Sequence, residues 1–134
     1  MIDIANVEQV GNLEVLRAMI VPEHSRTAFF GEKIVAAAGV VPLWNGVGQG
    51  WAVVDTSVPQ KFAVARAMRR GMRDIVRNGP FHRVHADVLA DYSKGQKFLK
   101  MLGFTHEGPL EAFGPTGADY QRFAFVSREL IKEG

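Results

Sequence analysis

The sequence has 134 residues, which suits one domain, and its formal net charge is +2. Apolar residues make up 47% and charged residues 22%, ordinary values for a globular protein with a hydrophobic core. Because the chain has no cysteine, a disulfide, a cysteine nucleophile and a thiolate metal site are excluded. The absence fits a reducing compartment, although many exported proteins also lack cysteine, and a cytoplasmic location is the expectation. No apolar run is long enough for a membrane span, and the N-terminus lacks the pattern of a secretory signal.

Residues 1–25 allow two interpretations. Apolar residues at every third position from Val7 to Ile20 favour a helix, whereas alternation from Leu13 to Val21 favours a strand. Both remain open, and Pro22 ends either element.

Three short strands are predicted next. The first covers Arg26–Gly31, and a turn at residues 31–33 leads to the almost wholly apolar strand Ile34–Leu43. A glycine-rich connection, Asn45–Gly50, leads to a buried strand over Trp51–Asp55. Because the connections are short, we expect an antiparallel meander.

A helix is predicted from Pro59 to about Asn78, where the period of the apolar residues changes. Ser57 and Gln60 form a capping-box pattern at its start, and Gly79-Pro80 ends it. The inward-facing residues are expected to be Phe62, Ala65, Met68, Met72, Ile75 and Val76.

The remaining chain alternates between strands and a helix. Arg83–Ala90 has the period of a strand, with Val84, Ala86, Val88 and Ala90 on one side. A helix follows over about Tyr92–Leu102, and Phe104–Phe113 and Asp119–Ser127 form a closing hairpin.

This order of elements predicts an α/β fold with one central mixed sheet. The antiparallel meander comes first, and its last strand begins a β-α-β-α series of helix, strand and helix, which the C-terminal hairpin follows. The strands over residues 51–55 and 83–90 flank a helix and should therefore be parallel neighbours.

Two segments resemble the GCN5-related N-acetyltransferase (GNAT) family. Gln60 to Ala65 resembles the family's acetyl-CoA loop, which reads Gln or Arg, two residues, Gly, one residue, then Gly or Ala, with Ala63 in place of the glycine. Residues 88–92 with 98–104 resemble its strand, helix and closing Leu-Gly-Phe, with Tyr92 where Asn is usual. The resemblance covers about residues 26–128 and implies a single GNAT-like domain over 1–134 with a shortened N-terminal region.

The resemblance implies acetyl-CoA as co-substrate, with the sheet splayed to admit its pantetheine arm. Independently of the family, a helix N-terminus offers free N–H groups and a positive dipole end to a pyrophosphate. If the Ala63 position needs a positive φ, alanine is strained there, and if it is helical, alanine is harmless. Ala63 and Ala65 can also be read as ordinary helix formers packed on the sheet. The implied cofactor-binding residues are Val53, Val54, Asp55, Gln60, Lys61, Phe62, Ala63, Val64, Ala65 and Arg66.

Acetyl transfer needs a proton acceptor for the amine and an acid for the thiolate. Leu99 occupies the position where many family members have an acidic tyrosine, so Tyr92 and then Tyr120 are the alternatives. Asp55 and His85 are the first candidates for the general base, and Glu32 and Asp87 are further candidates. Asp55 can equally cap the following helix, and His85 can be an ordinary histidine on the surface or against a helix.

No metal site is expected, because His82 and His85 are three apart on a strand and face opposite sides. A basic stripe reads as a solvated helix face, as a site for the 3′-phosphate of CoA, or as a contact with an acidic partner. Without interleaved aromatic residues, nucleic acid is not expected. The stripe consists of Arg66, Arg69, Arg70, Arg73 and Arg77.

The function expected is direct transfer of an acetyl group from acetyl-CoA to an amine. The short N-terminal region leaves the acceptor side open or completed by a second subunit, as in a homodimer. The alternative is a non-catalytic acetyltransferase-like binding or assembly protein, since the chain is also similar to small acetyltransferase-like proteins of tailed bacteriophages, some of them virion components.

Overall fold

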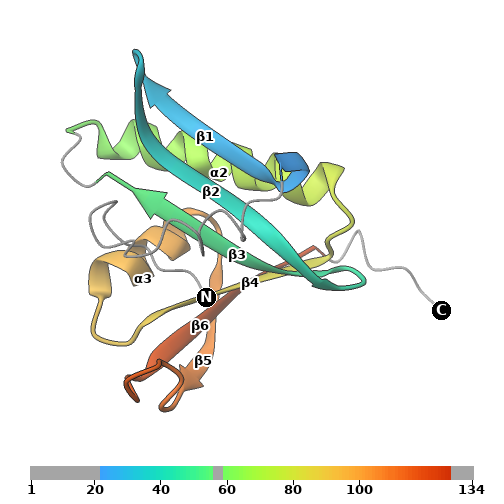
Figure 1. The fold of residues 1–134 in the computed structure, drawn as a ribbon, viewed down its shortest axis with the longest axis vertical. Helices are drawn as coiled ribbons and strands as arrows, with labels where there is room; N and C mark the ends of the chain where they lie inside the picture. Colours follow the sequence, from blue (N-terminus) through green and yellow to red (C-terminus); the bar gives the residue numbers. More distant parts are fainter. Residues whose placement is uncertain (1–21, 56–58, 128–134) are drawn as a thin grey trace.

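A computed structural model describes residues 22–55 and 59–127 of the chain. Its six strands form one mixed sheet in the order β1-β2-β3-β4-β6-β5 (Figure 1). The residues around Val7–Val21 and Ser57 lie outside the described ranges. The elements are η2 (Pro22–His24), β1 (Ser25–Phe30), β2 (Lys33–Trp44), β3 (Val47–Val54), α2 (Lys61–Asn78), β4 (Arg83–Leu89), α3 (Ser93–Met101), β5 (Thr105–Leu110) and β6 (Tyr120–Val126).

The predicted meander and the parallel neighbours are confirmed. β1, β2 and β3 pair antiparallel in sequence, and β4 lies parallel to β3. The predicted glycine-rich connection is wrong, because only Asn45 and Gly46 form the turn and β3 already begins at Val47. Gly48 belongs to the strand, where it pairs with Pro42 and Val84. Glycine is required there because a Cβ would lie 2.2 Å from Cγ1 of Val40.

Helix α2 begins later than the capping pattern predicted. Its N-cap is Gln60, whose side chain makes no capping hydrogen bond. Phe62 does not face inward: it is 76% exposed and lies one turn before Arg66, on the same side of the helix as the arginines. The helix ends at Gly79 as predicted, where the backbone N–H donates to the carbonyl of Ile75.

Both helices pack on one face of the sheet. A Cβ on Gly71 of α2 would lie 3.3 Å from Arg26, and one on Gly95 of α3 would lie 2.7 Å from Val88. The strand registers place Arg26 and Val88 on the same face. α2 lies across β1 and β2 (Figure 1).

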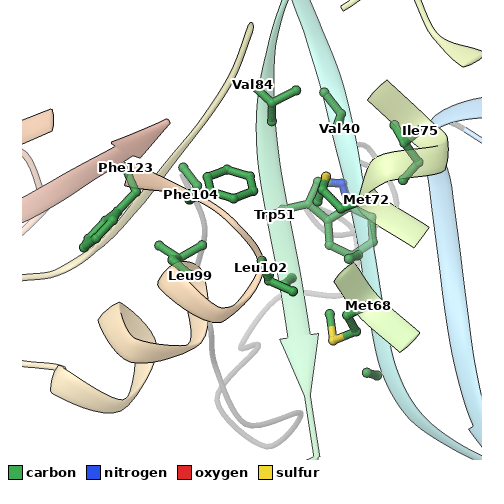
Figure 2. Close-up of a cluster of buried hydrophobic side chains, with 14 of the residues drawn as sticks. Val40, Trp51, Met68, Met72, Ile75, Val84, Leu99, Leu102, Phe104 and Phe123 are labelled. Atoms are coloured by element: carbon green, nitrogen blue, oxygen red, sulfur yellow. The ribbon is translucent and has the colours of Figure 1, made fainter. Parts of the chain in front are cut away.

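Most of the buried core side chains fill the space between this face and the helices (Figure 2), whereas the register places Trp51 on the opposite face of the sheet. Burying side chains of this size contributes roughly 1.5–3 kcal/mol each before the entropy cost of ordering them. Within the described ranges, no helix is long and apolar enough to cross a membrane. The labelled core residues are Val40, Trp51, Met68, Met72, Ile75, Val84, Leu99, Leu102, Phe104 and Phe123.

Candidate functional site

The sheet splits between β3 and β4. The two strands pair at only three positions, the last being Gln49 with His85. Beyond it β3 runs on to Val54 and β4 to Leu89 without further pairing between them, and Figure 1 shows the two strands diverging. The predicted splay is therefore present, and it leaves the last five residues of β3 with a ladder partner only in β2. An extended ligand arm can pair with such a strand.

The N-terminus of α2 presents free backbone donors. Its first helical hydrogen bond runs from the N–H of Val64 to the carbonyl of Gln60, at 3.1 Å. The N–H groups of residues 61–63 therefore have no acceptor within the helix. No acidic residue occupies the first turn, so the positive end of the dipole is open to an anion.

Ala63 is helical and free of strain. Among the described non-glycine residues, only Ala112 has a positive φ. Of the two conformations considered for this position, it adopts the helical one, in which alanine is not strained. Around it, Gln60, Ala63 and Arg66 are exposed, whereas Val64 and Ala65 are buried against the core.

Asp55 follows β3 at the open end of the fork. Its backbone N–H donates to the carbonyl of Val35 at 2.8 Å, and its carboxylate lies 3.1 Å from Nζ of Lys33. It does not cap α2, because the N-cap is Gln60. Asp55 is thus a half-buried, ion-paired carboxylate.

His85 lies at the closed end of the fork. The interpretation of it as a surface histidine is wrong, because it is 4% exposed. The strand register places it on the face opposite α2 and α3, so it faces neither of the described helices. Its Nδ1 is buried without a hydrogen-bond partner. Burial lowers the pKa of His85 to about 4, helped by Arg122 and Arg83 and opposed by Asp87. The imidazole is therefore neutral at pH 7 and is a weak base.

Asp87 is the centre of a buried ionic cluster that joins three strands. The side chain is 0% exposed and accepts from Nε of Arg122 at 2.8 Å and from its Nη2 at 3.0 Å. Nε2 of Gln49 reaches it from β3 at 3.4 Å. The bond to Asp87 raises the pKa of Arg122. The sequence placed Asp87 among the minor bases, and only the pairing of β4 with β6 brings Arg122 opposite it.

A second ion pair joins the start of β4 to β5. Arg83 donates to the two carboxylate oxygens of Glu107 at 2.7 and 2.5 Å. These bonds raise the pKa of Arg83 and lower that of Glu107. The pair is more exposed than Asp87 and lies away from the open end of the fork.

The three predicted catalytic residues do not form one group. Tyr92 is the N-cap of α3, at the same open end of the fork as Asp55. His85 lies four residues before the end of β4, or about 13 Å back along the strand. Leu99 is fully buried, so no acid is available at that position. Among the described residues, no three His, Cys, Asp or Glu side chains are placed to bind a metal ion.

The chain has the fold of GNAT acetyltransferases. The ribosomal-protein-S5-alanine acetyltransferase from Vibrio fischeri is 19% identical over 76% of this chain and 59% of that one, with a TM-score of 0.65. A GNAT-family acetyltransferase from Streptococcus pneumoniae is 13% identical, with coverages of 84% and 73% and a TM-score of 0.68. The Microcin C7 self-immunity acetyltransferase MccE, solved with acetyl-CoA and AMP, is 19% identical, with coverages of 70% and 55% and a TM-score of 0.60.

This chain therefore spans less than two thirds of the Vibrio fischeri enzyme and of MccE. No protein-family model matches the sequence, and no curated protein matches it.

Proposed function

We propose that the protein is an acetyl-CoA-dependent N-acetyltransferase. The observation that carries the proposal is the combination of a forked sheet with an open helix N-terminus directly after the fork's first strand. One elongated ligand with a peptide-like arm and a pyrophosphate matches both features. Acetyl-CoA is such a ligand, and MccE was solved with it bound.

In this proposal the pantetheine arm pairs with the backbone of Val53, Val54 and Asp55. The pyrophosphate is held by the N–H groups of residues 61–63, and the exposed guanidinium of Arg66 contacts a phosphate. Buried Ala65 lets the helix lie close to the sheet, and exposed Gln60 and Phe62 flank the phosphates.

The acceptor nitrogen attacks the acetyl carbonyl, the C–S bond breaks, and CoA leaves as a thiolate. The nitrogen loses one proton and the thiolate gains one. Asp55 at the open end of the fork is proposed to accept the amine proton through water, and Tyr92 at the same end to protonate the thiolate. His85 is given no proton transfer in this proposal, because a group with a pKa of about 4 holds a proton poorly at pH 7 and it lies about 13 Å back along β4 from the open end.

The first test is the melting temperature with and without acetyl-CoA. At 100 times its dissociation constant, a ligand of the native state adds about 2.7 kcal/mol of stability. For a domain of this size we expect a rise of roughly 5–10 °C.

Two exposed alanines of α2 give a matched pair of variants for this test. Ala63→Glu places a carboxylate in the first turn, which suits the helix dipole but repels a pyrophosphate. Ala67→Glu makes the same change one turn later. We expect Ala63→Glu to keep its own melting temperature and lose most of the acetyl-CoA shift, while Ala67→Glu keeps both. An equal shift in the two variants contradicts the site.

A non-catalytic binding or assembly protein is the second proposal, and buried Leu99 favours it because the usual acid is missing. Release of free CoA thiol from acetyl-CoA, in the presence of amines, separates the two. The Vibrio fischeri enzyme is named for the alanine of a ribosomal protein, so an alanine peptide belongs in the panel beside a polyamine. Self-association without thiol release supports the assembly proposal. A cytoplasmic location and a bacteriophage source stay predictions.

A further inference from the structure

The basic stripe of α2 lies on the outer side of the helix. At 3.6 residues per turn, its five arginines fall within roughly 100° of the helix circumference. The buried side chains of α2, from Val64 to Val76, occupy the opposite side and belong to the core. The stripe therefore points away from the sheet into solvent. Its members, all exposed, are Arg66, Arg69, Arg70, Arg73 and Arg77.

The small net charge of the chain conceals an uneven distribution. Helix α2 has six basic residues and one acidic residue, Asp74, so its net charge is +5. Since the whole chain carries +2, the residues outside α2 together carry −3. Positive charge is thus concentrated on one helix, which is the electrostatic pattern of a surface that binds a polyanion.

The described part of the chain supplies no carboxylate partner for the basic stripe. Within residues 22–55 and 59–127, Arg83 and Arg122 are paired with carboxylates, whereas no arginine of the stripe is in an ion pair. Like charges three and four residues apart on a helix repel each other. A bound polyanion would replace this repulsion by attraction.

The spacing and chemistry of the stripe fit a row of phosphates. The arginines recur at every turn, about 5.4 Å apart along the helix axis, over a length of about 16 Å. A nucleic-acid strand presents phosphates at regular intervals, and a guanidinium group binds a phosphate through two parallel hydrogen bonds. Because the charges form a single line, they match one strand better than the two strands of a duplex.

An aromatic side chain extends the same line. Phe62 is 76% exposed and falls in the same sector of the helix, one turn before Arg66. Nucleic acid was not expected as long as no aromatic residue accompanied the arginines, and the outward position of Phe62 removes that objection. Nucleobases stack on exposed aromatic side chains in proteins that bind single strands, so Phe62 favours a nucleic acid over an acidic protein.

We infer that the outer side of α2 binds a single-stranded nucleic acid, whose phosphates contact the basic stripe and one of whose bases stacks on Phe62. Contacts to phosphates carry no sequence information, so RNA and DNA of any sequence are bound alike. Phe62 and Arg66 also border the proposed cofactor site, whereas the rest of the stripe continues along the helix away from it. The surface needs no bound cofactor and does not depend on acetyl transfer.

Fluorescence anisotropy of labelled oligonucleotides tests the surface. The probes are a uridine homopolymer, a thymidine homopolymer and a DNA duplex, each roughly 20 nucleotides long and so longer than the ~22 Å from Phe62 to Arg77. We expect both single strands to bind with Kd values on the order of 1–100 µM at about 100 mM salt. The duplex, whose bases are not free to stack on Phe62, should bind about fivefold more weakly. No binding of the single strands at ~100 µM protein, or equal binding of the duplex, overturns the inference.

Variants of exposed residues separate the stripe from the net charge. Arg69→Gln with Arg73→Gln removes two phosphate contacts, so the slope of log Kd against log salt should become shallower by about 1.4. Lys97→Gln with Lys100→Gln removes the same charge from exposed positions of α3 and should leave the slope unchanged. Equal changes in the two double variants overturn the inference, since net charge alone would then account for binding. Unchanged melting temperatures show that all four substitutions leave the fold intact.

The stacking contact has its own variant. Phe62→Ala removes no charge, so it should weaken binding about fivefold or more without changing the salt slope. An unchanged Kd in Phe62→Ala overturns the inference that a base stacks there.

Two competitors distinguish nucleic acid from the other anions that fit the stripe. With saturating CoA, which shares Phe62 and Arg66, oligonucleotide binding should weaken by at most about tenfold. Complete displacement by CoA assigns the stripe to the cofactor and overturns the inference. Poly-L-glutamate should displace the labelled strand roughly tenfold less effectively per charge than an unlabelled uridine homopolymer. Equal displacement assigns the surface to an acidic protein and also overturns it.

Discussion

Removing Arg122 from its ion pair with Asp87 should lower the stability of the protein more than removing the charge of Asp87. Asp87 is 0% exposed, whereas the side chain of Arg122 is 29% exposed. Arg122→Met leaves a buried carboxylate with only the long hydrogen bond from Gln49, at 3.4 Å. Breaking a buried pair in this way costs about 3–5 kcal/mol. Asp87→Asn leaves a guanidinium that can turn toward water, so we expect a smaller loss of about 1–3 kcal/mol.

Replacing both partners should recover most of the loss. Asp87→Leu with Arg122→Met removes both charges together, and such exchanges are often neutral in other proteins. Urea unfolding followed by circular dichroism measures the free energy of unfolding of these three variants and of Asp87→Leu alone, which closes the double-mutant cycle. A coupling energy of at least about 2 kcal/mol is expected between the two sites. Equal losses below 1 kcal/mol in the two single variants would refute the view that Asp87 is buried as a charge.

Three other changes have definite expected outcomes. His85 has a folded pKa of about 4 against 6.5 in the unfolded chain, so stability should fall by up to about 3 kcal/mol as the pH drops from 6.5 to 4. His85→Leu should flatten that part of the urea-unfolding profile, and an unchanged slope would contradict the assignment. Gly48→Ala should lower the melting temperature by more than 5 °C, because its Cβ would lie 2.2 Å from Val40. Arg69→Glu should raise stability by roughly 0.5–1 kcal/mol in urea unfolding, because it replaces repulsion from Arg66 and Arg73 with attraction, and a loss would indicate a hidden partner.

Periodicity predicted the elements of the fold well and the details of packing less well. The helix over residues 61–78 and the strand over 83–89 were predictable because apolar side chains recur at 3.6 and 2 residues. Gly48 was misread as a loop residue, because its role depends on Val40 in a neighbouring strand. Phe62 was misread as a core residue, because apolar character alone does not fix which side of a helix it lies on.

The candidate site could likewise be predicted from the sequence only in part. The fork was expected from the resemblance to the family. The helix was expected from the change in apolar period and a short motif, although it begins two residues later than predicted, at Lys61. The cluster around Asp87 did not, since Gln49, Asp87 and Arg122 are far apart in sequence and meet only through strand pairing. The burial of His85 could not be predicted from the sequence either, because a histidine beside alternating apolar residues is also typical of a surface strand.

The most direct measurement of the central claim is the map of backbone amide shifts when acetyl-CoA is added to the ¹⁵N-labelled protein. The account predicts saturable shifts in the second half of β3, from Trp51 to Val54, and in the first turn of α2, from Lys61 to Val64. Free CoA should reproduce the shifts of the first turn. Saturable shifts confined to other elements, or no shift with millimolar acetyl-CoA, would contradict the claim that the fork and the helix start form one cofactor site.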